Sequence, residues 1–167
     1  MEKKTATDIL KTAILLERKG KAFYSTIAKQ TGSVAVRKIF TMMAEEEDEH
    51  IKFLSDQFKN YQQTKSFAKN PPNNQVDDTD VVKILSEEVK KEISAASFEA
   101  AAISAAIDFE NNAIKIYSDR AVEATDVNEK EMYQMLADWE KTHHQLLYQL
   151  SEDLKENIWN DNNFWPF

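Results

Sequence analysis

The sequence predicts an all-α domain, a four-helix bundle whose second and third helices are joined by one long crossover. The chain has 167 residues but only two glycines and three prolines, whereas folds rich in turns use many more. Four long segments place apolar residues every three or four positions, which is the spacing of one helix face. The two halves of the chain also resemble each other, which indicates two copies of a helical hairpin.

Helix start and stop signals place each element in turn. Asp8 is the expected N-terminal cap of the first helix, and residues 31–33 (Thr-Gly-Ser) separate this helix from the second. The prolines at 71–72 interrupt the helical pattern. Ser94 or Ser97 is the expected start of the third long helix. The long helices are expected over residues 7–30, 34–59, 94–125 and 127–157, and a short helix is expected over 79–91.

These elements divide the chain into one bundle domain, residues 1–158, and an aromatic tail, residues 159–167. The domain consists of a hairpin over 7–59, a crossover over 60–93 that contains the short helix, and a hairpin over 94–157. Short turns make the two helices of each hairpin antiparallel. The crossover is long enough to travel the length of the bundle. We expect the tail to pack against the bundle, with a dimer contact as the alternative.

Composition excludes several classes of protein. The formal net charge is −8, from 29 acidic and 21 basic residues, so neither nucleic acid nor an anionic membrane is an expected partner. No apolar run approaches the roughly 18–20 residues that span a bilayer. The absence of cysteine excludes disulfides and cysteine-based metal sites. The charged N-terminal residues do not resemble a signal peptide, so we expect a cytoplasmic location.

An internal repeat relates the two hairpins. Residues 13–54 align with residues 106–147 without a gap when the sequence is shifted by 93 positions, and twelve of the 42 aligned pairs are identical. The identical pairs with polar side chains of chemical interest are Glu17/Glu110, Tyr24/Tyr117, Glu47/Glu140 and His50/His143. Each polar residue of interest in one hairpin therefore has a counterpart at the same place in the other.

Each long helix carries an apolar stripe that a carboxylate interrupts near its middle, and the second and fourth helices add a histidine. The interrupting residues are Glu17, Glu47, His50, Glu110, Glu140 and His143. Four carboxylates in a bundle core cannot stay ionised and unpaired, because burial of an isolated charge costs several kcal/mol. Two divalent cations would balance four carboxylates. Oxygen and imidazole ligands suit iron or manganese, and zinc is an easy substitute.

The Glu-x-x-His spacing supports this interpretation. Residues three apart on a helix lie one turn apart on the same side, so a carboxylate and an imidazole can bind one ion together. Glu47 with His50 and Glu140 with His143 both have this spacing. A single Glu-x-x-His is a weak signal, but two that are related by the same offset as Glu17 and Glu110 are a strong one.

On these residues the sequence resembles the ferritin-like di-iron carboxylate superfamily, and most closely its rubrerythrin branch. The resemblance covers most of residues 7–155 and is carried by Glu17 with Tyr24, residues 44–50, Glu110 with Tyr117, and residues 140–143. It implies a ferritin-like four-helix bundle that binds two iron ions. It also implies that Glu47 and Glu140 bridge the ions, that Glu17 and Glu110 are terminal ligands, and that His50 and His143 each bind one ion.

The sequence departs from the rubrerythrin pattern in two ways. The four cysteines of a rubredoxin domain are absent, so we expect electrons to come from an external donor. Ala113 stands where the family carries an additional glutamate, one turn after Glu110. The family links that glutamate to redox-dependent movement of iron and to peroxidase activity.

Three further residues are candidates for hydrogen bonds to the metal ligands. Tyr24 and Tyr117 lie two turns after Glu17 and Glu110, and either pack in the core or donate to a ligand carboxylate on a facing helix. Glu46 is a weaker candidate for such a contact. The neighbouring acids Glu45, Asp48 and Glu49 are expected to face solvent.

The leading functional hypothesis is a di-iron oxidoreductase that reacts with hydrogen peroxide or dioxygen, works with an external electron donor and forms a homodimer. One alternative is a ferritin-like protein that oxidises and stores iron, which would assemble into a large cage. Another is a non-enzymatic bundle that bound metal merely stabilises. Metal analysis and native mass are the measurements that separate the three.

Overall fold

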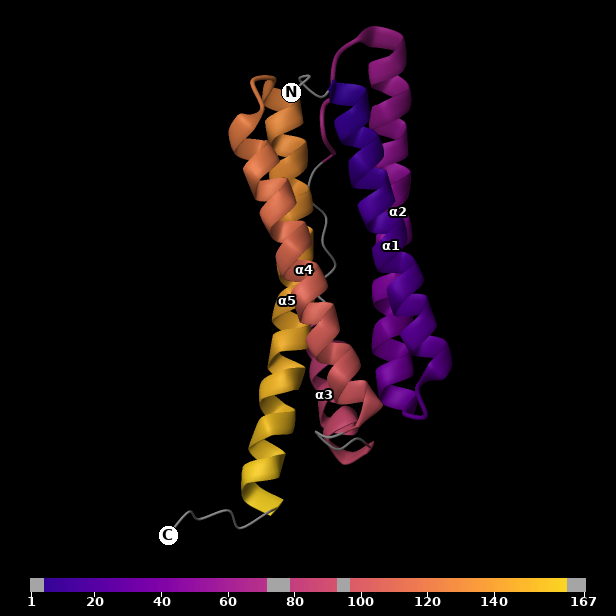
Figure 1. Cartoon of the computed structure of the whole chain (residues 1–167), viewed down its shortest axis with the longest axis vertical. Coiled ribbons are helices and arrows are strands. Elements are labelled where there is room, and N and C mark those ends of the chain that lie inside the picture. Colours follow the sequence, from indigo (N-terminus) through magenta and orange to yellow (C-terminus); the bar gives the residue numbers. More distant parts are fainter. Residues whose placement is uncertain (1–4, 72–78, 93–96, 162–167) are drawn as a thin grey trace.

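The computed structural model describes residues 5–71, 79–92 and 97–161, and within these ranges the chain forms five helices and no strand. The helices are α1 (Ala6–Gln30), α2 (Val34–Thr64), α3 (Thr79–Glu92), α4 (Phe98–Glu123) and α5 (Val127–Asp161). Figure 1 shows α1 beside α2 and α4 beside α5, as two hairpins that together form the bundle. The expected all-α bundle is confirmed.

Side-chain caps start the long helices. The N-cap of α1 is Thr5, whose side chain accepts a hydrogen bond from the backbone N–H of Asp8, while the Asp8 carboxylate accepts one from the backbone N–H of Thr5. Asp8 is therefore the second member of a capping box and not the N-cap that the sequence predicted. Ser33 caps α2, and Ser97 caps α4.

Three helix ends differ from the predicted boundaries. Helix α2 continues past Lys59 to Thr64, where Lys65 adopts a left-handed conformation with φ 59° and closes the helix. The additional turn places Tyr61 against Phe67, with ring centroids 4.9 Å apart, an apolar contact that sequence periodicity does not reveal. Helix α4 ends at Glu123, and α5 runs on to Asp161. The predicted tail therefore begins inside a helix, and residues 162–167 lie outside the described residues.

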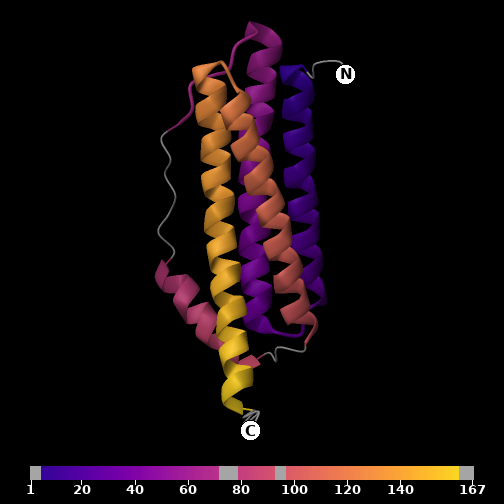
Figure 2. The same cartoon turned by 60° about the vertical axis from the view of Figure 1, so that its left-hand side comes forward.

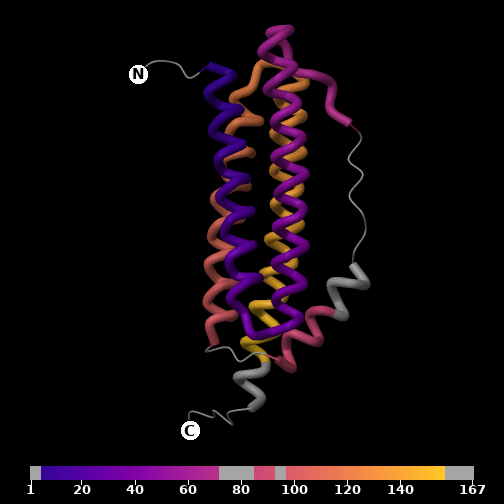
Figure 3. The backbone as a smooth tube through the Cα atoms, turned by 90° about the vertical axis from the view of Figure 1, so that its right-hand side faces the viewer, coloured from indigo at the N-terminus to yellow at the C-terminus, as the bar shows by residue number. Residues whose placement is uncertain are grey.

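The crossover reaches both ends of the bundle. In Figures 2 and 3 the segment after α2 and helix α3 lie toward opposite ends, and α3 packs against α2 and α5. The two antiparallel hairpins are thus joined by one long crossover, as in the ferritin-like class of four-helix bundle. None of the helices in the described ranges combines the length and the apolar character that crossing a membrane demands.

A polar layer divides the apolar core into two clusters. One cluster includes Tyr24, Phe40 and Leu147, and the other includes Leu10 and Tyr133. Full burial of a large apolar side chain contributes roughly 1.5–3 kcal/mol, so the clusters on both sides hold the four helices together. The helices can therefore carry buried carboxylates between the clusters.

A candidate metal centre in the bundle core

The polar layer consists of the six side chains that interrupt the apolar stripes. All are buried, with exposed fractions between 0% and 6%: Glu17, Glu47, His50, Glu110, Glu140 and His143. Each of the four long helices contributes one glutamate, and α2 and α5 each add a histidine one turn later. The structure therefore brings together, from all four helices, the residues that the sequence proposed as metal ligands.

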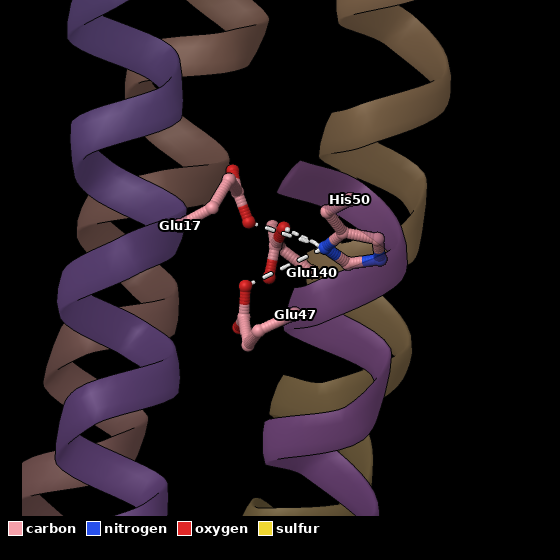
Figure 4. Close-up of side chains that lie close together, drawn as sticks. All are labelled: Glu17, Glu47, His50 and Glu140. Carbon is pink, nitrogen blue, oxygen red and sulfur yellow. Dashed lines mark hydrogen bonds and ion pairs between the residues drawn. The ribbon is translucent and has the colours of Figure 1, made fainter. Parts of the chain in front are cut away.

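The six residues form two overlapping groups, each with ligand atoms within 4.8 Å of one another. The first group consists of Glu17, Glu47, His50 and Glu140. In Figure 4 the carboxylates of this group surround Nδ1 of His50, at 3.2 Å for Glu17, 3.3 Å for Glu140 and 3.5 Å for Glu47. A cation between these atoms would meet three carboxylates and one imidazole.

The second group mirrors the first and consists of Glu47, Glu110, Glu140 and His143. Nδ1 of His143 lies 3.4 Å from Glu110 Oε1, 3.4 Å from Glu140 Oε2 and 3.8 Å from Glu47 Oε1. Glu47 and Glu140 belong to both groups, whereas each of the other four residues belongs to one. This is the geometry of two neighbouring ion positions that share two carboxylates.

Gly20 provides space for one of the shared carboxylates. A Cβ atom at Gly20 would lie 3.0 Å from Glu47 Oε1 and 3.0 Å from Phe109 Cε1. Sequence reasoning assigned Gly20 no role. A glycine in the middle of a helix costs roughly 0.5–1 kcal/mol relative to alanine. Its presence there is the signal that could have indicated a side chain packed closely against the helix backbone.

Tyr24 and Tyr117 contact the centre symmetrically. The Tyr24 hydroxyl donates to Glu110 Oε1, and the Tyr117 hydroxyl donates to Glu17 Oε1. Each bond joins the two hairpins, and both tyrosines are fully buried. Burial and the adjacent Glu110 carboxylate raise the pKa of Tyr24, so its hydroxyl keeps its proton and remains a donor. The carboxylates of Glu110 and Glu17 are thus each oriented from the opposite hairpin.

The outer faces of the two histidines meet different residues. Nε2 of His143 lies 2.6 Å from Glu46 Oε2, a contact between α5 and α2. The ring of His50 instead stacks on Trp139, with centroids 4.6 Å apart and ring planes at 10°. Sequence reasoning named Glu46 as a weak candidate and missed Trp139. The repeat could have found it, because Trp139 occupies the position equivalent to Glu46.

The carboxylates and imidazoles compete for protons. Burial raises the pKa of Glu17, Glu47 and Glu110, in the last case to about 8. For Glu140 burial acts in the same direction, but the nearby imidazoles of His143 and His50 outweigh it and lower its pKa. Burial would lower the pKa of both histidines, yet their carboxylate partners raise it well above the usual value. These raised pKa values leave protons on the carboxylates and imidazoles of the centre, and bound cations would displace them.

Several buried polar atoms of the centre have no hydrogen-bond partner within the described part of the chain. They are Glu47 Oε1 and Oε2, Glu140 Oε1 and Oε2, Glu110 Oε2 and His143 Nδ1. A buried polar atom without a partner costs roughly 1–3 kcal/mol. In the described part of the chain, the ion pairs of the four glutamates are all with His50 and His143 and none is with a lysine or arginine. The same atoms are ligands that a divalent cation accepts. The residues present thus fit two metal ions.

A bundle with one long crossover, in which four glutamates and two histidines meet in the core, defines a ferritin-like carboxylate protein. Comparison with protein families agrees with this class. Residues 8–151 match the family model described as rubrerythrin, and the match spans both hairpins and the crossover. The chain belongs to the rubrerythrin family. Comparisons with curated proteins and with solved structures gave no match.

Proposed function

We propose that this protein is a di-iron oxidoreductase that reduces hydrogen peroxide or dioxygen with electrons from an external donor. The observation that supports it is the pair of overlapping groups in the core, which share Glu47 and Glu140. Two adjacent ions can act together on the two oxygen atoms of a small oxidant.

The proposed ligands follow from the two groups. Glu17 and His50 would hold one ion, Glu110 and His143 the other, and the two shared glutamates would contact both. When bound, two Fe(II) ions supply the two electrons that, with two protons, break the O–O bond of hydrogen peroxide and give two waters. Carboxylate and imidazole ligands suit iron and also manganese, so the metal is part of the proposal.

The remaining residues of the centre position the ligands and exclude water. Tyr24 and Tyr117 donate hydrogen bonds to the terminal carboxylates and so fix their orientation. The two apolar clusters cover the polar layer from both sides, which keeps bulk water away from the reacting oxidant. Cations would displace the protons that the carboxylates and histidines hold, so that metal uptake releases protons.

The direct test is an anaerobic single-turnover experiment. The full chain is loaded with Fe(II), hydrogen peroxide is added, and the remaining peroxide and the remaining Fe(II) are both measured. We expect one peroxide consumed and two Fe(II) oxidised per chain, faster than for the same amount of free Fe(II). A Glu140→Gln variant is the matched control and should lose this activity. Peroxide consumption no faster than with free Fe(II) would reject the proposal.

Oligomeric state separates this function from iron storage. An iron-storage protein would assemble into a large cage, whereas we propose a homodimer. Native mass spectrometry of the full chain gives the answer directly. A large assembly that accumulates many more than two irons per chain would favour storage.

A further inference from the structure

The two hairpins differ at the pair of equivalent positions whose side chains contact the two histidines on the side away from the carboxylates. The repeat pairs the glutamates, tyrosines and histidines of the centre without exception, but it pairs Glu46 with Trp139. Each of these two residues contacts the histidine of the other hairpin. The difference therefore falls where it can make the two metal positions unequal.

Behind His143 stands a carboxylate. Nε2 of His143 lies 2.6 Å from Glu46 Oε2, while Nδ1 of the same ring faces the carboxylates of the centre. The Glu46 side chain is 43% exposed, whereas that of His143 is 6% exposed. With Glu46 accepting the hydrogen of Nε2, the neutral imidazole would direct the lone pair of Nδ1 at the centre, where a cation can take the place of the second proton. A carboxylate in this place also makes the imidazole a stronger metal ligand.

Behind His50 stands an aromatic ring. Trp139 covers the face of the imidazole, and Phe53 packs edge-on against Trp139 with centroids 5.6 Å apart. In the part of the chain that the structure describes, the ion pairs of His50 are all made through Nδ1. Stacking fixes the plane of the ring but adds no negative charge. Trp139 therefore holds His50 in place without the negative charge that Glu46 brings to the outer side of His143.

We propose that Glu46 makes the two metal positions unequal, so that the position of Glu110 and His143 binds its ion more tightly and fills first. This inference rests on the proposed function only in that both positions bind a divalent cation. A carboxylate behind a ligand histidine typically changes metal affinity 10–100-fold, and we expect a difference of about this size between the two positions. Glu46 is a positioning residue, because it acts through His143.

The alternative is that Glu46 only links the two hairpins. Its contact with His143 joins α2 to α5, and such a contact would contribute to stability whatever metal is bound. In that case a substitution would lower the unfolding free energy and leave both metal-binding steps at their original affinities. Binding isotherms and stability measurements therefore distinguish the two roles.

The experiment is a titration of the metal-free full chain with Zn(II) by calorimetry and with Co(II) by visible absorption. The native sequence should show two steps that differ about 10–100-fold in affinity. In Glu46→Gln the tighter step should weaken by about the same factor, and the weaker step should stay unchanged. Glu45→Gln removes an equal charge from the adjacent exposed position, and Trp139→Phe keeps an aromatic ring behind His50. Both controls should retain the tight step.

Two results would overturn the inference. One is two equal steps in the native sequence, and the other is a Glu46→Gln isotherm that superimposes on that of Glu45→Gln. Circular dichroism checks that each variant is folded, and the half-exposed position of Glu46 makes the substitution mild. Either result leaves the proposed function intact if the loaded protein still consumes peroxide. Failure of the native sequence to bind metal would reject both proposals.

Discussion

The two hairpins of the bundle are alike where they face the centre and different one layer behind it. Glutamate, tyrosine and histidine recur at equivalent positions, and each makes the equivalent contact. Behind them, the equivalent positions 46 and 139 hold a charged glutamate and an aromatic tryptophan. The equivalent and buried residues Gly20 and Ala113 differ in size by one methyl group. The comparison shows that the six candidate ligands and the two tyrosines follow the repeat, whereas other residues that contact them do not.

The largest effect should come from the residues that the two groups share. Replacing Glu47 or Glu140 with glutamine removes a charged ligand from both ion positions, so either variant should lose most of both metals. Replacing Glu17 or Glu110 affects one group only and should leave about one ion per chain. Elemental analysis of protein purified without chelators measures this. Equal metal loss in all four variants would contradict the division into shared and unshared ligands.

A second effect should appear in the pH dependence of stability. The pKa of Glu110 is about 8 in the folded protein against 4.5 as its ordinary value, so the folded state binds more protons between these values. Stability of the metal-free protein should therefore fall as pH rises through this range. The two histidines act in the same direction, since their pKa values are also raised, whereas Glu140 acts in the opposite direction and only below 4.5, because its pKa is lowered.

Bound cations replace those protons, so the metal-loaded protein should lose less stability over the same range. The gap in melting temperature between loaded and metal-free protein should then widen from about pH 5 to about pH 8. Thermal unfolding of both forms, followed by circular dichroism, provides the measurement. A gap that narrows with rising pH would mean that metal does not bind in place of these protons.

The tyrosine pair should show an intermediate and symmetrical effect. Tyr24→Phe and Tyr117→Phe each remove the hydroxyl that donates to a buried terminal carboxylate, Glu110 and Glu17 respectively. Each should lower the unfolding free energy of the metal-free protein by roughly 1–3 kcal/mol. Urea denaturation measures the loss, and Tyr148→Phe on the exposed side of α5 is the control. Losses that differ strongly between the two would show that the halves are less alike than their contacts indicate.

The smallest effect should come from Gly20 and Ala113. Ala113→Gly should cost roughly 0.5–1 kcal/mol of unfolding free energy through the backbone alone, with metal affinity unchanged. Gly20→Ala should weaken metal binding, because its methyl group would press on the Glu47 carboxylate at 3.0 Å. Denaturation and metal titration of both variants test this pair. Unchanged metal affinity in Gly20→Ala would show that Glu47 has room to move aside.

Much of the fold could be predicted because its signals are local. Apolar spacing along the chain determines which face of each helix is buried, and the repeat determines that the two hairpins are equivalent. The spacing and the repeat together predict that Glu17, Glu47, Glu110 and Glu140 lie on the inward faces of their helices. The helix ends were less certain, because α2 closes at Lys65 in a left-handed conformation, which a glycine would have signalled but a lysine does not.

By itself, then, the sequence determined the class of fold and the layer of six polar residues. Only the tertiary structure decided how the helices lie against one another along their axes, and so which side chains meet across the bundle. It pairs Tyr24 with Glu110, Glu46 with His143 and Trp139 with His50. The physical reason is that helical periodicity defines a face but not the height at which two faces meet, which depends on the packing of the whole core.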